Sequence, residues 1–287
     1  MGRTPRRPGS KTPGAGDGVF LRPARPRLFE KGMVIPMKQQ TITWVGHGSW
    51  KMVTPSGTVI YVDPNIRRNP ACRISLEDCY DADIVCITHG HDDHIGCGDA
   101  IEIAKAADAT LVALADLCLY ASRHGYPYDK GGGATGVGAN VRVADCAIHC
   151  VHAEHTSAIW GYEYETDGVM MPGTGCCGFV IAPDGGVPVY FAGDTGIFSD
   201  MKLIGALYHP EVAVLPVGDK YVMGLMEASV AAGLIGARTV IPGHYDTWPP
   251  IRQNMDEFAR LLAEHAPDCT LRVLKPGEST VCESDRH

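Results

Sequence analysis

The sequence lacks a membrane-spanning run, because no window approaches the roughly eighteen uncharged apolar residues of a transmembrane helix. It also lacks a Cys-x-x-Cys pair of the kind that builds a zinc ribbon. The glycine-rich stretch Tyr128–Asn140 does not end in the Lys-Ser/Thr of a phosphate-binding P-loop, so we interpret it as a surface connection. With 20% charged residues, the composition is that of a soluble globular protein without a membrane partner.

The eleven cysteines indicate a reducing compartment, since their odd number and scattered spacing fit no small disulfide framework. Cys86, Cys146 and Cys150 stand inside apolar, strand-like runs, where a free thiol behaves as a small core side chain. We interpret the vicinal pair Cys176-Cys177 in the same way, as packing at the start of a strand. The prediction is a cytoplasmic protein with free cysteines.

The net charge of −8 is unevenly distributed along the chain. Residues 1–36 carry eight Lys/Arg against Asp17 and Glu30, a net of +6, which leaves −14 for the remainder. An acidic body of this kind repels phosphate backbones, so we expect no nucleic-acid partner. Residues 1–36 are basic and rich in Pro and Gly, and they are predicted to be a disordered or non-native leader, with a transit peptide as the alternative. Residues 37–287 are predicted to form a single domain.

From Thr41 onward, short β-rich runs such as TITWVG, TVIYVD and DIVCIT are interspersed with helix-like segments. The first half of this region is rich in strands, and the second half alternates strand and helix. This mixture predicts sheets covered by helices, an α/β layered sandwich. Helices are expected at Asp99–Ala107, Ala115–His124, Asp200–Tyr208, Leu225–Ile235 and Asn254–Glu264.

Three histidines and two aspartates crowd into the stretch CITHGHDDHIG, at the end of an apolar run. The run predicts a buried strand that ends at Thr88, followed by a turn and then a helix from about Gly98. Imidazole and carboxylate together suit Zn²⁺, Mn²⁺ or Fe²⁺, whereas Ca²⁺ prefers oxygen ligands alone. A solvated turn is the alternative interpretation. The candidate ligands in the pattern H-x-H-x-D-H are His89, His91, Asp93 and His94.

Three further groups of the right chemical type follow three other apolar runs. AIHCVHAEH ends at His155, VPVYFAGD at Asp194, and RTVIPGH at His244. One such residue would be interpreted as structural, but three of them together with the dense turn favour a metal site. His152 lies on the same segment as His155, so either of these two histidines could supply the ligand.

These motifs resemble the metallo-β-lactamase superfamily. More closely, TWVGHGSW, VDPN, THGHDDHIG, FAGDTGIFSDM, LPVGDKYVMG and IPGHYDTWP resemble its metal-dependent hydrolase branch, which includes ascorbate-6-phosphate lactonase. The resemblance covers roughly residues 41–250 and implies a four-layer αββα sandwich that holds two divalent metal ions, zinc or manganese, with iron as a further candidate. By this resemblance one metal is held by His89, His91 and His155, the second by Asp93, His94 and His244, and Asp194 bridges the two.

The resemblance implies a dinuclear hydrolase of a small ester, most closely a lactone, in which metal-bound hydroxide attacks the carbonyl group. Asp93 would assist proton transfer, and Asp194 would hold both metals. The alternatives are hydrolysis of a small phosphodiester and, in another class, a non-catalytic metal-binding or sensor protein. A small-molecule substrate and a homo-oligomer are expected by analogy with relatives.

A second group of residues is expected beside the metals or the substrate. Asp63 ends another strand-like run, and an outer carboxylate there would orient a metal ligand, although a turn-forming Asp-Pro is the alternative. For each remaining candidate, a structural or solvent-exposed role is the alternative. The remaining candidates are His47, Asp219, Lys220, Tyr221 and Tyr245, with Thr247 and the aromatic residues Trp160, Tyr162 and Tyr164 left open between pocket and packing.

Overall fold

The computed structural model describes residues 39–173 and 175–282, all of which belong to one compact unit. The predicted leader, residues 1–36, lies outside the described residues. Within the described part of the chain, no helix is both long and apolar enough to cross a membrane.

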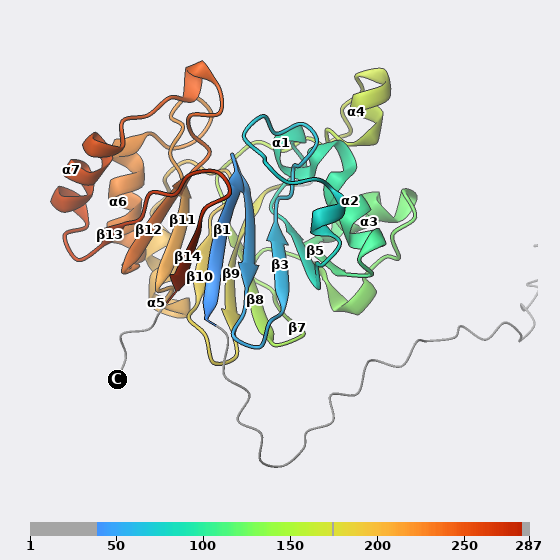
Figure 1. Ribbon diagram of the computed structural model, residues 1–287, viewed down its shortest axis with the longest axis horizontal. Coiled ribbons are helices and arrows are strands. Elements are labelled where there is room, and N and C mark those ends of the chain that lie inside the picture. The colour runs from blue at the N-terminus through green and yellow to red at the C-terminus, as the bar shows by residue number, and fades with distance from the viewer. Residues whose placement is uncertain (1–38, 174, 283–287) are drawn as a thin grey trace, which may run out of the picture. The chain divides into compact units, whose positions relative to one another are not determined.

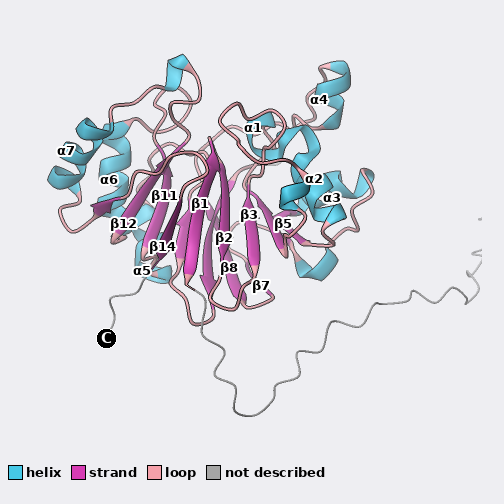
Figure 2. Ribbon diagram, viewed as in Figure 1, coloured by secondary structure: helices cyan, strands magenta, loops and turns pink. Residues whose placement is uncertain are grey.

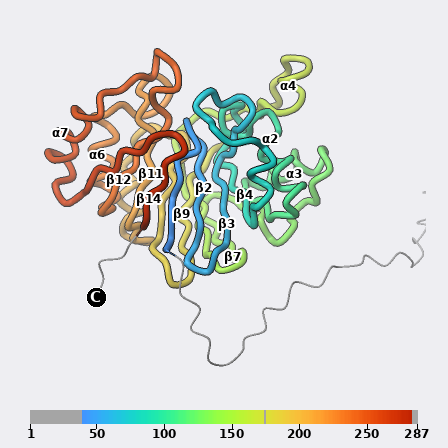
Figure 3. Tube along the Cα trace, viewed as in Figure 1, coloured from blue at the N-terminus to red at the C-terminus, as the bar shows by residue number. Residues whose placement is uncertain are grey.

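The first sheet is built around the N-terminal strands, in the order β14-β1-β2-β3-β4-β5-β6. β1 and β2 form an antiparallel hairpin, whereas β3, β4 and β5 run parallel to one another. The C-terminal strand β14 pairs with β1, and Figure 3 shows this red strand beside the blue start of the domain. The strands are β1 (Gln40–Gly46), β2 (Ser49–Val53), β3 (Val59–Val62), β4 (Ile84–Ile87), β5 (Thr110–Leu114), β6 (Ala134–Thr135) and β14 (Ser279–Cys282).

The second sheet has the order β13-β12-β11-β10-β9-β8-β7. β10, β11 and β12 are parallel, and β8 and β9 extend the sheet in antiparallel fashion. The strands are β7 (Asn140–Val143), β8 (Cys146–His152), β9 (Cys177–Pro183), β10 (Val189–Phe191), β11 (Val212–Pro216), β12 (Thr239–Gly243) and β13 (Thr270–Leu271).

Helices cover the outer faces of both sheets. Figure 1 shows α2 and α3 on one side and α6 and α7 on the opposite side, and Figure 2 shows the strands gathered between them. The predicted α/β sandwich is therefore confirmed. The α-helices are α1 (Asp92–Ile95), α2 (Asp99–Ala106), α3 (Ala115–Arg123), α4 (Tyr162–Asp167), α5 (Met201–Tyr208), α6 (Leu225–Ile235) and α7 (Met255–His265), and the 3₁₀ turns are η1 (Glu77–Cys79), η2 (Gly96–Gly98), η3 (Lys130–Gly132) and η4 (Pro249–Ile251).

The layers are held together by two apolar clusters. The larger cluster joins inward side chains of both sheets, such as Trp44 and Phe179, to α6 and α7, and the smaller one packs α2 and α3 on β4 and β5. Cys86, Cys146 and Cys150 are free and buried in the larger cluster, in agreement with their interpretation as core side chains.

The five predicted helices are all present, with bounds within a residue or two, but several other elements were missed. The segment after His91 was predicted to be a turn, and that prediction was wrong, because residues Asp92–Ile95 form the one-turn helix α1. Its end is fixed by Gly96 in the left-handed conformation (φ +63°), which closes the turn. The strand β2 was not predicted. It is stabilised by pairing with β1 and β3 on either side, and the residues of β2 alone do not reveal that pairing.

The carboxyl ends of strands from both sheets meet at one edge of the sandwich, where ligands commonly bind in such folds. Asp63 follows β3, His89 follows β4, Asp194 follows β10 and His244 follows β12. This arrangement brings together polar residues that are far apart in the sequence.

Phe179 lies fully buried between the sheets, so Phe179→Ala is expected to lower the free energy of unfolding by about 3–5 kcal/mol through lost burial and a cavity. Leu207→Ala on α5 removes an apolar side chain that is 67% exposed, and it is expected to change the value by no more than about 0.5 kcal/mol. Urea unfolding at equal metal concentration measures both. Equal losses for the two variants would contradict the assignment of Phe179 to the core.

Candidate metal centre

The H-x-H-x-D-H motif divides between a strand end and the short helix that follows it. β4 ends at Ile87, so His89 and His91 lie in the extended segment after it, and Asp93 and His94 lie on α1. The helical turn directs the two pairs of side chains to different neighbours. His89 and His91 approach His155, whereas Asp93 and His94 approach His244.

The first set consists of three imidazoles, those of His89, His91 and His155, whose candidate ligand atoms all lie within 4.8 Å of one another. Nε2 of His89 lies 3.0 Å from Nδ1 of His91. The hydroxyl of Thr88 donates to Asp63, so its oxygen can accept from Nδ1 of His89 at 3.1 Å, which leaves Nε2 of that ring as a lone-pair donor. By contrast, His152 is half exposed and pairs with Glu154. The structure therefore places His155, and not His152, in this set.

The second set brings Asp93, His94 and His244 together, and it also includes His47 within the same 4.8 Å limit. Nε2 of His244 lies 3.5 Å from Oδ2 of Asp93. Nδ1 of His94 hydrogen-bonds Oδ2 of Asp63 at 2.9 Å, so the opposite nitrogen of the His94 ring faces the cluster.

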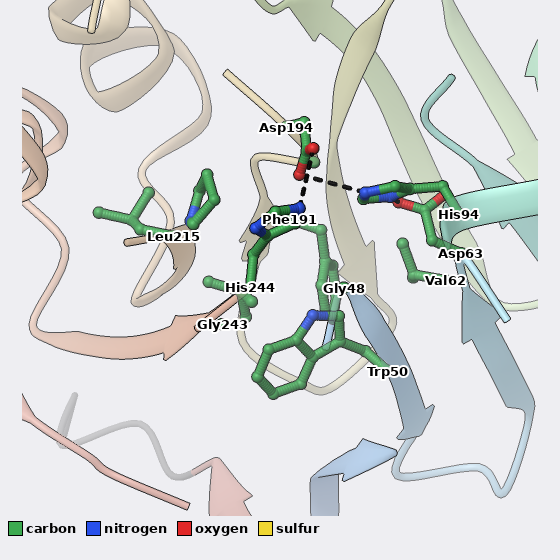
Figure 4. Close-up of a pocket in the computed structure, with 13 residues that line it drawn as sticks. Gly48, Trp50, Val62, Asp63, His94, Phe191, Asp194, Leu215, Gly243 and His244 are labelled. Carbon is green, nitrogen blue, oxygen red and sulfur yellow. Dashed lines mark hydrogen bonds and ion pairs between the residues drawn. The ribbon is translucent and has the colours of Figure 1, made fainter. Parts of the chain in front are cut away.

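Asp194 lies between the two sets and is almost fully buried. Its Oδ1 is 3.2 Å from Nε2 of His94, and its Oδ2 is 3.2 Å from Nε2 of His244 and 3.6 Å from Nε2 of His155. Figure 4 shows this carboxylate between the His94 and His244 rings, with dashed lines for both ion pairs. Asp194 thus contacts histidines from both sets.

The two sets differ in their protonation. Burial lowers the pKa values of His89, His91 and His155, so these imidazoles are neutral near pH 7. Burial alone would also lower the pKa of His244, but the adjoining Asp194 and Asp93 carboxylates outweigh it and raise that pKa to about 9.

His94 in the second set and Asp194 between the two sets are charged as well. The pKa of His94 is raised well above its usual value, because Asp194 and Asp63 outweigh the effect of burial. Burial would raise the pKa of Asp194, but His244 and His94 hold it well below its usual range. In the metal-free protein, protons on the imidazoles therefore balance the buried carboxylate.

Apart from the ion pairs given above, several buried atoms of this cluster have no hydrogen bond among the described residues, and such atoms are costly in a folded protein. They are Nε2 of His94, Oδ1 of Asp194 and both ring nitrogens of His244. A cavity of about 20 Å³ adjoins them, lined by Asp194, His94 and His244 (Figure 4). Divalent transition-metal ions fit this donor set of imidazole and carboxylate, because an ion could replace the protons on His94 and His244 and balance the charge of the buried carboxylate.

An outer layer of hydrogen bonds orients the ligand side chains. Oδ1 of Asp63 accepts from the backbone N–H of Thr88 at 2.7 Å, and Oδ2 accepts from the Thr88 hydroxyl at 2.6 Å. Since Oδ2 also accepts from His94, this one carboxylate aligns His94 directly and His89 through Thr88. Asp63 and His244 adopt φ values of +49° and +55°, unusual for non-glycine residues and typical of functional sites.

His47 bridges the second set and the segment after His244. Its Nε2 lies 3.0 Å from Oδ2 of Asp93, and its Nδ1 lies 2.9 Å from Oγ1 of Thr247. Burial, together with His244, lowers the pKa of His47 to about 4, so its ring is neutral and can donate only one hydrogen bond. The structure thus places His47 in contact with a proposed ligand.

The other predicted pocket residues lie in two places. Asp219, Lys220 and Tyr221 form an exposed loop after β11, and Lys220 Nζ lies 5.4 Å from the centre of the Tyr221 ring. Among the described residues, no hydrogen bond, ion pair or ring contact joins these side chains to the histidine cluster, although the backbone N–H of Met223 donates to the carbonyl oxygen of Thr195. Tyr245 is buried against Trp44, with ring centroids 5.2 Å apart.

Sequence reasoning missed some residues that shape the cluster. Thr88 was predicted only to end a strand, although its position directly before His89 indicated that its side chain could contact that ring. Gly48 was also missed: a Cβ atom there would lie 2.7 Å from Cε1 of His94, so only glycine leaves room for that ring. Trp160, left open earlier, packs its ring 5.4 Å from that of His91.

Residues 41–244 match the family described as the beta-lactamase superfamily domain. The chain is 40% identical over 238 residues to a UPF0173 metal-dependent hydrolase of Methanopyrus kandleri, across 83% of this chain and 98% of that protein. It is 38% identical over 239 residues to a UPF0173 metal-dependent hydrolase of Methanosphaera stadtmanae, across 83% of this chain and 97% of that protein.

Among solved structures, the chain is similar to Igni18, a novel metallo hydrolase from the hyperthermophilic archaeon Ignicoccus hospitalis. The TM-score is 0.72 and the sequence identity is 32%, and the match covers 86% of this chain and all of that one. The predicted superfamily and its metal-dependent hydrolase branch are thereby confirmed. The chain belongs to the metallo-β-lactamase superfamily and, within it, to the UPF0173 metal-dependent hydrolases.

Proposed function

We propose that this metal-dependent hydrolase cleaves a small neutral ester, a lactone in the first instance, at a centre that holds two divalent ions of zinc or manganese. The observation that carries the proposal is the position of Asp194 between two separate sets of ligand atoms. His89, His91 and His155 would hold one ion, Asp93, His94 and His244 the other, and Asp194 would contact both.

Two such ions, when bound, lower the pKa of a shared water and polarise a substrate oxygen. The protein supplies the rest. Asp93 is the most exposed carboxylate of the cluster, with 21% of its side chain accessible, so substrate and water can reach it. Its Oδ2 faces His47 and His244, and among the described residues its Oδ1 accepts no hydrogen bond. Asp93 is therefore placed to orient a water molecule and take up its proton.

The surroundings of the cluster favour a neutral substrate over a phosphodiester. Phosphoryl groups are commonly held by Arg or Lys side chains in addition to metals. Within the described residues, Asp93 and Asp194 form ion pairs with histidines alone, and the neighbouring Arg68 is 3.7 Å from Asp92. A lactone carbonyl needs no such cation, because its negative charge develops only as the nucleophile attacks.

Metal analysis distinguishes His152, the last residue of β8, from His155, which follows that strand. His155→Ala is expected to lower the bound metal per chain by about half or more, because it removes one of three imidazoles of the first set. His152→Ala serves as the matched control and is expected to keep the full content, since His152 pairs with Glu154 at the surface. Mass spectrometry of desalted, metal-reconstituted protein gives the ratio. Loss of metal in the His152 variant alone would reverse the assignment.

Proton release from a lactone panel tests the reaction. Asp93→Asn is expected to lower the rate roughly 10²–10⁴-fold, the usual contribution of a positioned proton acceptor. Asp92→Asn, the adjacent carboxylate whose ion pair is with Arg68, is the matched control and should lose no more than a few-fold. Turnover of bis(4-nitrophenyl) phosphate and of no lactone would replace the lactone proposal with phosphodiester hydrolysis.

Metal binding to the second set is expected to release protons. His244 has a pKa of about 9 without metal and is protonated at pH 7, but only a neutral imidazole can bind the ion. Affinity at this set should therefore fall as the pH drops below about 9, by about tenfold per pH unit for each displaced proton. The three-histidine set, whose pKa values are lowered, should show no such slope near pH 7.

Titration calorimetry in buffers of different ionisation enthalpy measures this proton release. The heat of metal binding to the set that contains His244 should depend on the buffer, and the heat of binding to the three-histidine set should not. Buffer-independent heats for both events would contradict the protonation assigned to His244.

A further inference from the structure

A second cavity, of about 480 Å³, lies beside the metal centre. Its walls come from β1, from residues 70–73 after β3, from the segment after β12 with the start of α7, and from residues 273–276 ahead of β14. Figure 1 shows the last of these, in red, leading into the start of β14 beside β1. The backbone N–H of Gly277 donates to the carbonyl oxygen of Trp44 at 2.6 Å, so the wall is fixed to the strand.

The deep part of the cavity is aromatic and rigid. The rings of Trp44 and Tyr245 stack with their centroids 5.2 Å apart and an interplanar angle of 14°. Both side chains are about 95% or more buried, so they are held in place by the core. Trp44 also stacks on Trp50, with ring centroids 5.9 Å apart, so the parts of Trp44 and Tyr245 that reach the cavity form a small, fixed apolar wall and not an open ring face.

Apolar side chains continue toward solvent at the sides of the cavity. Val273 is 42% exposed, and Met255 is partly buried against the core. A pocket of this size, mostly apolar and with a few polar groups at its edge, has the character of a small-molecule site. Neither the fold nor the proposed metal chemistry uses it.

The rim carries two cations with no partner. Among the described residues, the side chains of Arg73 and Lys275 form no hydrogen bond or ion pair with a side chain of opposite charge. One carboxylate, that of Asp246, also lines the cavity, but it accepts from the backbone N–H of Gln253 at 2.9 Å. The rim therefore has an excess of positive charge, although residues 37–287 as a whole carry a net charge of −14.

We propose that this cavity binds an organic anion with a flat apolar body, separately from the metal ions. The apolar body would lie against Met255 and Val273, above the apolar wall that Trp44 and Tyr245 form, and the anionic group would pair with Arg73 and Lys275 at the rim. This site does not depend on the hydrolase proposal, because none of its residues is a proposed metal ligand.

The cavity is joined to the metal centre through His47. Thr247 lines the cavity, and its hydroxyl contacts Nδ1 of His47 at 2.9 Å. The indole N–H of Trp44 donates to the carbonyl oxygen of His47 at 2.8 Å. A bound anion would thus lie one side chain away from the residue that contacts Asp93.

Titration calorimetry of the full-length, metal-loaded protein with 2-naphthalenesulfonate tests the site, since a sulfonate is a weak metal ligand. We expect one binding event per chain. The double substitution Arg73→Ala/Lys275→Ala should weaken it at least tenfold, and Val273→Trp, which fills the cavity from an exposed position, should remove it. The neutral analogue methyl 2-naphthyl sulfone should bind the unchanged protein at least tenfold more weakly than the sulfonate.

The matched control is Arg123→Ala/Lys202→Ala, which removes two exposed cations on α3 and α5 and should leave the affinity unchanged. Metal content and circular dichroism of each variant show that the fold is kept. No saturable binding, or binding that survives Val273→Trp, would overturn the proposal. Equal affinity for the sulfone, or equal losses in the control, would overturn the role of the two rim cations.

Discussion

The structure depends on one buried carboxylate. Asp194 lies at the edge where the two sheets meet, almost without access to solvent, and an isolated charge there would cost several kcal/mol. His94, on the helix that follows β4 of the first sheet, and His244, directly after β12 of the second, offset that cost by pairing with it. The closure of the two sheets at this edge is thereby coupled to the geometry of the proposed metal centre.

The residues around this carboxylate are held by backbone geometry that the sheets impose. His47, Asp63 and His244 all have positive φ, a conformation that costs free energy for residues other than glycine. Each is tied down: Asp63 accepts two hydrogen bonds from Thr88, and the backbone N–H of His244 donates to His47 O. The surrounding hydrogen bonds thus offset the strain and fix the side chains before any ion binds.

His47 occupies a junction between two sites of different chemistry. On one side it contacts Asp93 within a cluster of imidazoles and carboxylates, and on the other it is held by Trp44 and Thr247, which line an apolar cavity. Its low pKa keeps the ring neutral at physiological pH, so the contact does not switch with ordinary changes in acidity. A change at one site can therefore reach the other through a shift in the position of His47, and not through a change in its charge.

The sequence by itself determined the layered α/β fold, most helix bounds and the residues that gather at the cluster. Apolar periodicity marks the strands and helices, and ligand-type residues directly after strands are detectable because their positions are local properties. Tertiary structure decided the rest. Whether His155 or His152 faces the cluster, that Tyr245 packs on Trp44, and that His47 joins the second set follow from how the two sheets approach each other. Gly48 makes room for the ring of His94, which comes from another segment, so no local pattern could reveal its role.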